Sequence, residues 1–255
     1  MDFIIQAVTD IGNVKETNQD SMSVKRLCTN QGTMVFAVLC DGMGGLSKGE
    51  VASAAVVKAF EQWMWQKLPQ LASNPIESFA LKLQWEEVVQ SHNREIQEYS
   101  RRIGCSMGTT VVVMLLTQER YYIMNVGDSR AYELQSNLCC LTQDQTLVAE
   151  EVREGLLTEE QAKNDPRRSV LLQCVGASDN IFPDMYSGDV KKDAVYFLCS
   201  DGFHHEISDE EIAYYLQPAA LCDAQSMANN GNYLISLDKQ RQERDNISLV
   251  MVRTY

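Results

Sequence analysis

Residues 34–45 read MVFAVLCDGMGG, an apolar run that ends in an aspartate and glycines. Apolar residues at nearly every position, followed by an Asp-Gly step, are typical of a β-strand that is covered on both faces and ends in a turn. The strand would hold the backbone of Asp41 while its carboxylate projects from the sheet edge, and Gly42 would let other groups approach closely. This stretch therefore predicts an internal sheet with an acidic group at its edge.

The same arrangement recurs along the chain. Asp20 ends the stretch NQD, Asp128 lies in NVGDSR, Asp201 lies in FLCSDG, and Asp245 precedes an apolar run in RDNISLV. Clustered carboxylates remain ionised only with positive charge among them, so strand ends of this kind brought together predict a site for hard cations. Oxygen ligands suit Mg²⁺ or Mn²⁺ better than Zn²⁺.

Further apolar runs predict the other strands of the sheets. They are FIIQAV near the start, TTVVVMLL from Thr109, RYYIMNV from Arg120, AVYFLCS from Ala194 and ISLVMV at the end.

Two long helices are predicted between the second and third of these strands. The first runs from about Ser47 to Lys67, with helical spacing of Val51, Ala54, Ala55, Lys58 and Phe60. The second begins with a capping signal and runs to about Arg102; the signal is Asn74, Pro75 and Glu77.

Two capping boxes predict shorter helices, TEEQ at residues 158–161 and SDEE at residues 208–211. The first belongs to a charged stretch at about residues 144–168 that has no strand-like run, which indicates an insert over the surface, here called the flap. The 255 residues, 1–255, are otherwise expected to form one domain.

The composition excludes several classes of protein. A net charge of −13 would repel a phosphate backbone, so a nucleic-acid partner is not expected. Cysteines in apolar runs, without a C-x-x-C pair, indicate buried thiols in a reducing cytoplasm, and no window reaches the length of a membrane span. His92, His204 and His205 have no zinc-ligand spacing, which disfavours a zinc site or a Ser-His-Asp triad; the last two are expected as a turn-exposed pair.

Seven motifs in order resemble one family of enzymes. NQD, CDGMGG with GEVAS just beyond, MGTTVVV, NVGDSRAY, LTQDQT, LCSDG and DNISLVMV span Ala7 to Val252. They resemble the metal-dependent protein phosphatases (PPM, the type 2C serine/threonine phosphatases) in their compact bacterial form. The resemblance implies an α+β fold, a four-layer αββα sandwich with two central, mostly antiparallel sheets and helix pairs outside.

The resemblance also implies roles for the aspartates. Asp41 would bridge two metal ions and the Gly42 carbonyl would bind one of them. The second metal site would be completed by Asp20, Asp201 and Asp245. Asp128, with Asp201, would hold a third and more weakly bound ion.

The implied reaction is metal-dependent hydrolysis of phosphoserine and phosphothreonine in proteins. A water bridging the two core ions, Mn²⁺ or Mg²⁺, would attack phosphorus in line, and no nucleophilic side chain would be needed. The partners implied are phosphorylated proteins and a bacterial serine/threonine kinase that the enzyme opposes.

Three features depart from the family pattern. Lys15 stands where the family usually has a phosphate-holding arginine, and the resemblance implies that it contacts the substrate phosphate. A lysine offers a point charge rather than a two-pronged donor. Gln19 replaces a common glutamate. The flap carries QDQT and NDPRRS where relatives often show histidines, so a general acid from the flap is in doubt.

Two other functions remain open. A regulatory binding module would keep the fold and lose turnover, and a lost metal aspartate would be its signature, but all five positions hold aspartate. A nucleotide-binding protein would use DGMGG as a phosphate cradle, but the stretch lacks the Lys-Ser/Thr ending of a P-loop.

Overall fold

The apolar stretch at residues 34–40 is the middle of a strand whose two faces are both buried. Side chains of a strand alternate between faces. Val35, Ala37 and Leu39 point into the layer between two sheets, whereas Phe36 and Val38 point toward helices on the other side. This confirms the predicted internal sheet and explains why nearly every residue of the stretch is apolar.

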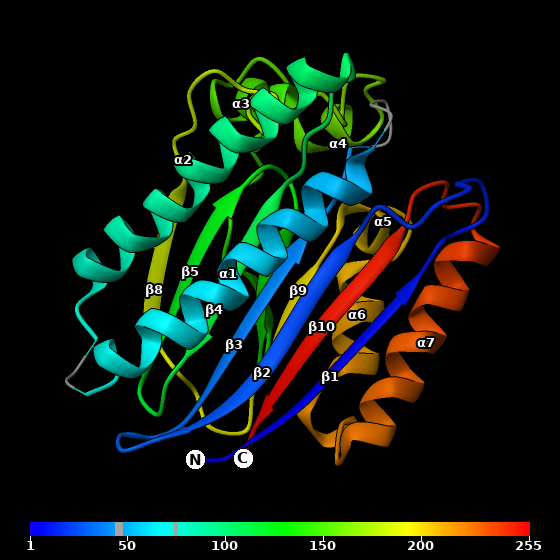
Figure 1. Cartoon of the computed structure of the whole chain (residues 1–255). Helices are drawn as coiled ribbons and strands as arrows, with labels where there is room; N and C mark the ends of the chain where they lie inside the picture. The colour runs from blue at the N-terminus through cyan, green and yellow to red at the C-terminus, as the bar shows by residue number, and fades with distance from the viewer. Residues whose placement is uncertain (44–47, 74–75) are drawn as a thin grey trace.

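The computed structural model describes residues 1–43, 48–73 and 76–255 and contains two five-stranded sheets that face each other (Figure 1). The first sheet has the order β1 (Phe3–Asp10), β10 (Ile247–Thr254), β9 (Val195–Cys199), β6 (Arg130–Leu134) and β7 (Leu138–Cys140). The second sheet has the order β2 (Ser21–Thr29), β3 (Gly32–Cys40), β4 (Val111–Leu116), β5 (Arg120–Val126) and β8 (Asp184–Asp189). Each neighbouring pair is antiparallel.

Helices cover the outer face of each sheet, which completes the four layers. The second sheet is covered by α1 (Gly49–Leu71) and α2 (Ser78–Ile103). The first sheet is covered by α5 (Asp201–His204), α6 (Asp209–Leu216) and α7 (Ala224–Gln240), with a short 3₁₀ turn, η1 (Pro218–Ala220), between α6 and α7. The predicted αββα sandwich is confirmed.

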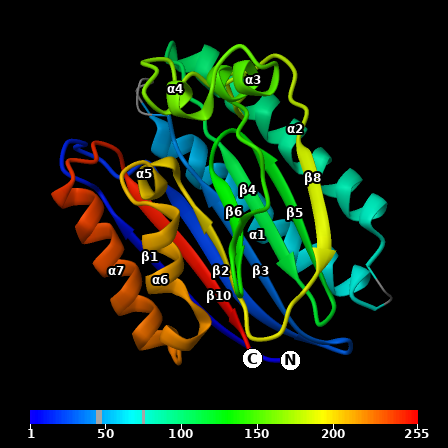
Figure 2. The same ribbon diagram turned by 180° about the vertical axis from the view of Figure 1, so that it is seen from behind.

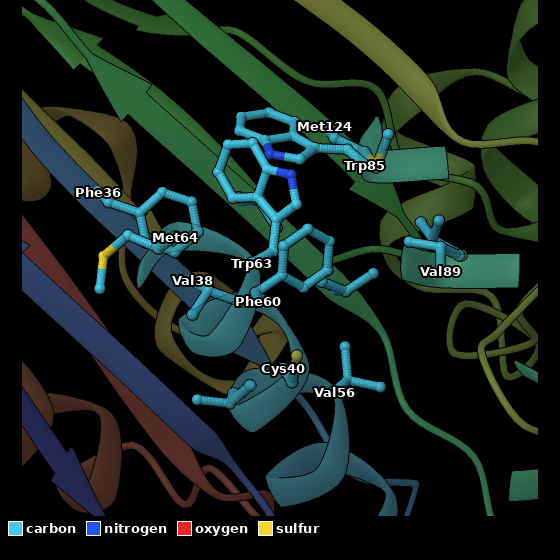
Figure 3. Close-up of a cluster of buried hydrophobic side chains, with 14 of the residues drawn as sticks. Phe36, Val38, Cys40, Val56, Phe60, Trp63, Met64, Trp85, Val89 and Met124 are labelled. Carbon is cyan, nitrogen blue, oxygen red and sulfur yellow. The ribbon is translucent and has the colours of Figure 1, made fainter. Parts of the chain in front are cut away.

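Aromatic side chains fill the layer between the second sheet and its helices. Trp85 of α2 lies edge-on to Trp63 of α1, with ring centroids 5.6 Å apart, and both contact Phe36 of β3 (Figure 3). Aromatic pairs in this geometry stabilise a core beyond the area that they bury. The layer holds α1 and α2 firmly on β3, the strand that leads to Asp41.

The long helices lie where they were expected, with different boundaries and a different buried face. The face of α1 that meets the sheet contains Ala52, Val56 and Phe60, whereas Val51 and Lys58 are exposed. The predicted start at Ser47 and the predicted caps Asn74 and Pro75 lie outside the described residues; Glu77 is the residue that precedes α2.

The flap lies between β7 and β8 and contains α3 (Leu147–Arg153) and α4 (Glu159–Lys163). Figure 2 shows both helices beyond the strand ends, at the same end of the sandwich as α5. The predicted capping boxes are present at Thr158 and Ser208. A return segment, residues 169–183, leads from the flap to β8.

The expectation of buried thiols is wrong for half of the cysteines. The buried ones are Cys40, Cys174 and Cys199, and the exposed ones are Cys28, Cys139, Cys140 and Cys222. Short or edge strands such as β2 and β7 leave alternate side chains in solvent, so a cysteine near an apolar residue need not be covered. In the described part of the chain, no helix is long and apolar enough to cross a membrane.

Candidate functional site

The aspartates singled out in the sequence lie where strands end or begin. Asp41 follows β3 and Asp20 precedes β2, and these neighbouring strands pair with Cys40 opposite Ser21. The two aspartates therefore come from directly adjacent positions at one edge of the second sheet. One residue, Ser200, separates Asp201 from the end of β9, and Asp201 is the first residue of α5. Asp245 lies two residues before β10, which is the neighbour of β9 in the first sheet.

A serine joins the two sheets at this edge. The hydroxyl of Ser200, which precedes Asp201, donates to Asp20 Oδ2 over 3.0 Å, and it accepts the backbone N–H of Ser248, also at 3.0 Å. Since Asp20 directly precedes β2 of the second sheet and Ser248 lies in β10 of the first, this hydroxyl links the two strand ends. The sequence did not identify Ser200, although its place beside Asp201 was a signal.

Two threonines hold the backbone of Asp41. The hydroxyl of Thr110 accepts the Asp41 N–H at 2.9 Å, and the Asp41 carbonyl accepts the Thr109 hydroxyl at 2.8 Å and the Thr110 N–H at 2.9 Å. Both threonines directly precede β4. With its main chain bonded in this way, Asp41 presents its carboxylate in a nearly fixed position.

Gly42 is required by close packing at this turn. Its N–H donates to the Gln19 carbonyl at 3.1 Å, and a Cβ at this position would lie 2.5 Å from that carbonyl oxygen and 2.5 Å from the backbone of Gly49. Any other residue would push the start of α1 away from the Asp20 segment. The glycine therefore lets β2, β3 and α1 meet at the site.

Burial and mutual repulsion act together on the aspartates. Burial, followed by the charges of neighbouring carboxylates, raises the pKa of Asp41 well above its usual range. Burial also raises the pKa of Asp20, to about 7, despite the hydrogen bonds from Ser248 and Ser200. The pKa values of Asp128 and Asp201 are raised as well, first by burial and then by other carboxylates, with His205 opposing the shift. Four carboxylates from separate strand ends thus share one electrostatic environment.

Two basic side chains, Lys15 and His205, lie beside the acidic groups of the site. Lys15 Nζ lies 2.7 Å from Asp245 Oδ1, and His205 lies between two carboxylates, 3.7 Å from Asp201 and 3.5 Å from Glu243. The expectation of a turn-exposed histidine pair is wrong, because α5 turns both rings inward and only 17% of the His205 side chain is exposed. The spacing of Asp201 and His205, one helical turn apart, was an available signal.

These residues fit a group of divalent cations bound partly through water. Within the described residues, Asp20 Oδ1 and Asp201 Oδ1 are buried with no hydrogen-bond partner in the protein, as expected of oxygens that serve as cation ligands. No set of three carboxylate, imidazole or thiol side chains among residues 1–43, 48–73 and 76–255 is close enough to enclose an ion. Mg²⁺ and chemically similar ions commonly use one or two carboxylates and keep several waters, so an open set of oxygens is compatible with them.

The remaining predicted positions, Asp128 and Gln19, lie beside groups that connect them to Asp41 and to α1. Asp128 lies in the turn between β5 and β6, beside Ser129, whose hydroxyl lies 2.7 Å from that of Thr110. Gln19 donates from Nε2 to Glu50 Oε2 at 3.1 Å, on the first turn of α1. Thr110 therefore links the Asp128 turn to the backbone of Asp41, and Gln19 links the Asp20 segment to α1.

Comparison with known proteins identifies relatives of the whole chain. Residues 13–231 match the family model described as protein phosphatase 2C. The serine/threonine phosphatase stp of Listeria monocytogenes (serotype 4b, strain F2365) is 30% identical over 247 residues, which are 96% of this chain and 93% of that protein. The serine/threonine protein phosphatase PstP of Mycobacterium tuberculosis (strain H37Rv) is 28% identical over 96% of this chain and 44% of its own length.

Solved structures show the same fold. The serine/threonine phosphatase Stp1 from Staphylococcus aureus has a TM-score of 0.83 at 26% identity, covering 98% of this chain and 94% of that one. The catalytic domain of PstP in complex with two manganese ions has a TM-score of 0.76 at 27% identity, covering 99% of both chains.

Proposed function

Because the chain belongs to the protein phosphatase 2C family, we propose that it hydrolyses phosphoserine and phosphothreonine in proteins. One observation carries the proposal: buried aspartates from separate strand ends raise one another's pKa values at a single edge of the sandwich. Such a cluster is unfavourable in a folded protein unless a cationic ligand offsets it. The repulsion among these carboxylates is explained if the cluster binds cations.

The proposed ligands are Asp20, Asp41, Asp201 and Asp245 with the Gly42 carbonyl, for two core ions. Asp128, with Asp201, would hold a third. Manganese in the related PstP catalytic domain supports Mn²⁺, and the oxygen-only ligand set suits Mg²⁺ equally. When bound, such ions supply a water acidic enough to attack phosphorus and positive charge for the phosphoryl oxygens.

The chain's own residues supply position and charge. The threonines at the start of β4 hold Asp41, and the Ser200 hydroxyl holds Asp20, so the carboxylates need little rearrangement on binding. Lys15 adds a positive charge beside Asp245, where it would orient the substrate phosphate. We also propose that the protein acts in the cytoplasm on phosphorylated proteins and opposes a serine/threonine kinase.

The test is hydrolysis of an aryl phosphate and of a phosphothreonine peptide with Mn²⁺. We expect Asp201→Asn to lower kcat by about 100-fold or more on both substrates, given that even outer groups around a metal cost 10–100-fold. Asp209→Asn, at an exposed aspartate on α6, is the matched control and should leave kcat unchanged.

Calorimetric titration with Mn²⁺ separates binding from turnover. We expect wild type to bind Mn²⁺ and Asp201→Asn to bind it more weakly. A wild-type protein that binds Mn²⁺ and hydrolyses neither substrate would instead be a regulatory module with the fold of a phosphatase.

A further inference from the structure

Gln145 stands at the base of the flap and bonds to three segments that are distant in sequence. Its N–H donates to the Gly127 carbonyl at 3.0 Å, and its carbonyl accepts the Leu172 N–H at 2.8 Å. Its side-chain Oε1 accepts the Gly127 N–H and Gln173 Nε2, both at 2.8 Å. Its Nε2 donates to Asp184 Oδ2 at 2.7 Å. The backbone and the side chain of one residue therefore join the β5–β6 turn, the return segment and the start of β8.

The position suits an amide side chain. Only 7% of Gln145 is exposed, so each polar group at this position must find a partner in the protein. An amide offers an acceptor and a donor at its two tips, and here the acceptor meets N–H groups while the donor meets a carboxylate. Because a carboxamide N–H is not acidic, Gln145 cannot protonate a leaving group, and its role must be structural or positional.

The bonds close the flap at its base. Gln173, which donates to Gln145, also exchanges two hydrogen bonds of 2.8 Å with the backbone of Phe182, near the end of the return segment. The segment that enters the flap and the segment that leaves it are thus bonded to each other through Gln145. The fastening lies beside the turn that carries Asp128.

That turn has little freedom of its own. Gly127 has φ +103, and a Cβ there would lie 2.7 Å from the side chain of Thr110. Both the N–H and the carbonyl of Gly127 bond to Gln145, and the carbonyl also accepts Asn125 Nδ2 at 3.2 Å. Gln145 is therefore the main contact of the flap with the residue that directly precedes Asp128.

We propose that Gln145 is a positioning residue that closes the flap at its base and fixes the Gly127–Asp128 turn, so that the flap and Asp128 move as one unit. The inference rests on the proposed function only where it assigns Asp128 a catalytic purpose. The coupling itself is a property of the folded chain and can be measured without metal or substrate.

The test is amide hydrogen exchange of the full chain without metal, read at Gly127, Leu172 and Phe182, whose backbone N–H groups bond to Gln145 Oε1, the Gln145 carbonyl and Gln173 Oε1. We expect Gln145→Leu to accelerate exchange at these amides by about 10-fold or more, because each loses a bonded partner or its support. The matched control is Gln161→Leu, at an exposed flap glutamine that only caps α4, and it should leave these amides as protected as in wild type.

A charge-exchange pair keeps the inference testable if Gln145→Leu does not fold. Gln145→Glu replaces the donor with a carboxylate 2.7 Å from Asp184, so it should accelerate exchange at the same amides. Adding Asp184→Asn restores a donor and acceptor pair in reversed order and should return protection to within about 3-fold of wild type. Wild-type protection in Gln145→Glu, or no recovery in the double variant, would overturn the proposal.

The kinetic readout distinguishes positioning from general loss of structure. Gln145→Glu should lower kcat on the aryl phosphate and on the phosphopeptide with little change in the temperature of unfolding, and Asp184→Asn should restore it. If neither wild type nor variant hydrolyses either substrate, the proposed function fails while the exchange result still decides the coupling. Parallel loss of kcat and of global stability without rescue would reduce Gln145 to a structural residue.

Discussion

Lys15 brings a positive charge into an acidic site. Burial disfavours its charge, but the bond to Asp245 and the nearby charges of Asp41 and Asp201 outweigh this and raise its pKa, so the side chain is protonated at neutral pH. Once a cation neutralises Asp245, the ammonium group has less reason to remain on that carboxylate. We therefore expect Lys15 to contact the substrate phosphate, as a point charge rather than the two-pronged donor of an arginine.

Replacing this lysine should weaken substrate binding more than catalysis. We predict that Lys15→Ala raises KM for a phosphothreonine peptide by about 10-fold, the effect of losing one hydrogen bond to a charged group, and that Lys15→Arg preserves KM. Lys239→Ala is the matched control, because Lys239 also lies 2.7 Å from an aspartate, Asp10, with 32% of its side chain exposed. An unchanged KM in Lys15→Ala would make Lys15 a structural partner of Asp245 alone.

At the level of single residues, the sequence was informative where chemistry is concentrated in one residue type. Aspartates at strand ends are recognisable, and the fold brings Asp20, Asp41, Asp128 and Asp201 into one electrostatic environment. Ser200 is different: its role depends on the distance between two sheets, and no local pattern encodes that distance. Gln145 likewise lies in a recognised stretch, LTQDQT, but the pattern does not reveal its partners, because its bonds form only when three remote segments meet.

At the level of elements, α2 anchors the return segment. Asn93, 2% exposed, accepts the Gly176 N–H at 2.7 Å and donates to the Ser178 carbonyl at 2.9 Å. Val175, which directly precedes Gly176, exchanges two backbone hydrogen bonds of 2.9 Å with Thr109, the residue that also binds the Asp41 carbonyl. The helix, the return segment and the Asp41 turn are therefore connected in series.

Replacing Asn93 should therefore destabilise the folded protein. We predict that Asn93→Leu lowers the free energy of unfolding by about 2 kcal/mol, because it leaves the buried Gly176 N–H without its partner and removes one of two donors to the Ser178 carbonyl. Urea unfolding measures the change. Gln97→Leu, which removes another donor to the same Ser178 carbonyl from a less buried position, should cost less, and an equal loss in both variants would contradict a special role for Asn93.

The sequence did not predict β2, β6, β7 or β8, and two of these, β2 and β8, take their extended conformation from a neighbouring strand. β2 carries Lys25 and Arg26 and lies at the edge of the second sheet, and β8 at the other edge reads DMYSGD, with hardly any apolar residue. Both are strands because they pair with β3 and β5, whose apolar runs were recognised. For these two edge strands, pairing with a neighbour decides the conformation more than intrinsic preference does.

At the level of the molecule, the cluster of aspartates should make stability depend on pH in an unusual direction. The folded chain holds protons on these carboxyls that the unfolded chain releases: Asp20 has its pKa raised to about 7, and those of Asp41, Asp128 and Asp201 are also raised. Between the usual pKa of an aspartate, about 4, and these raised values, the folded state binds more protons, so its stability falls as pH rises.

Divalent cations should reverse this dependence, since they bind the ionised carboxylates and compete with protons. We predict that Mn²⁺ at about 100 times its dissociation constant adds ~2.7 kcal/mol at pH 8, or roughly 5–10 °C in the temperature of unfolding, and much less at pH 5. Asp41→Asn should raise the metal-free unfolding temperature at pH 8 and abolish the shift with Mn²⁺. Thermal unfolding followed by circular dichroism, with and without Mn²⁺, measures both effects.

A second buried carboxyl separates the metal effect from the effect of burial alone. Asp238 of α7 is fully buried, and burial, followed by the charges of Glu243 and Glu206, raises its pKa to about 9. In the described part of the chain, neither of its carboxylate oxygens has a hydrogen-bond partner. Because the pKa of Asp238 is also raised by folding, this group lowers the stability of the fold as pH rises toward 9. Asp238→Asn should therefore raise the unfolding temperature at pH 8, whereas the shift caused by Mn²⁺ should persist. An Mn²⁺ shift of equal size at pH 5 and pH 8, or one lost in Asp238→Asn but kept in Asp41→Asn, would place the cations elsewhere than at the strand-end aspartates.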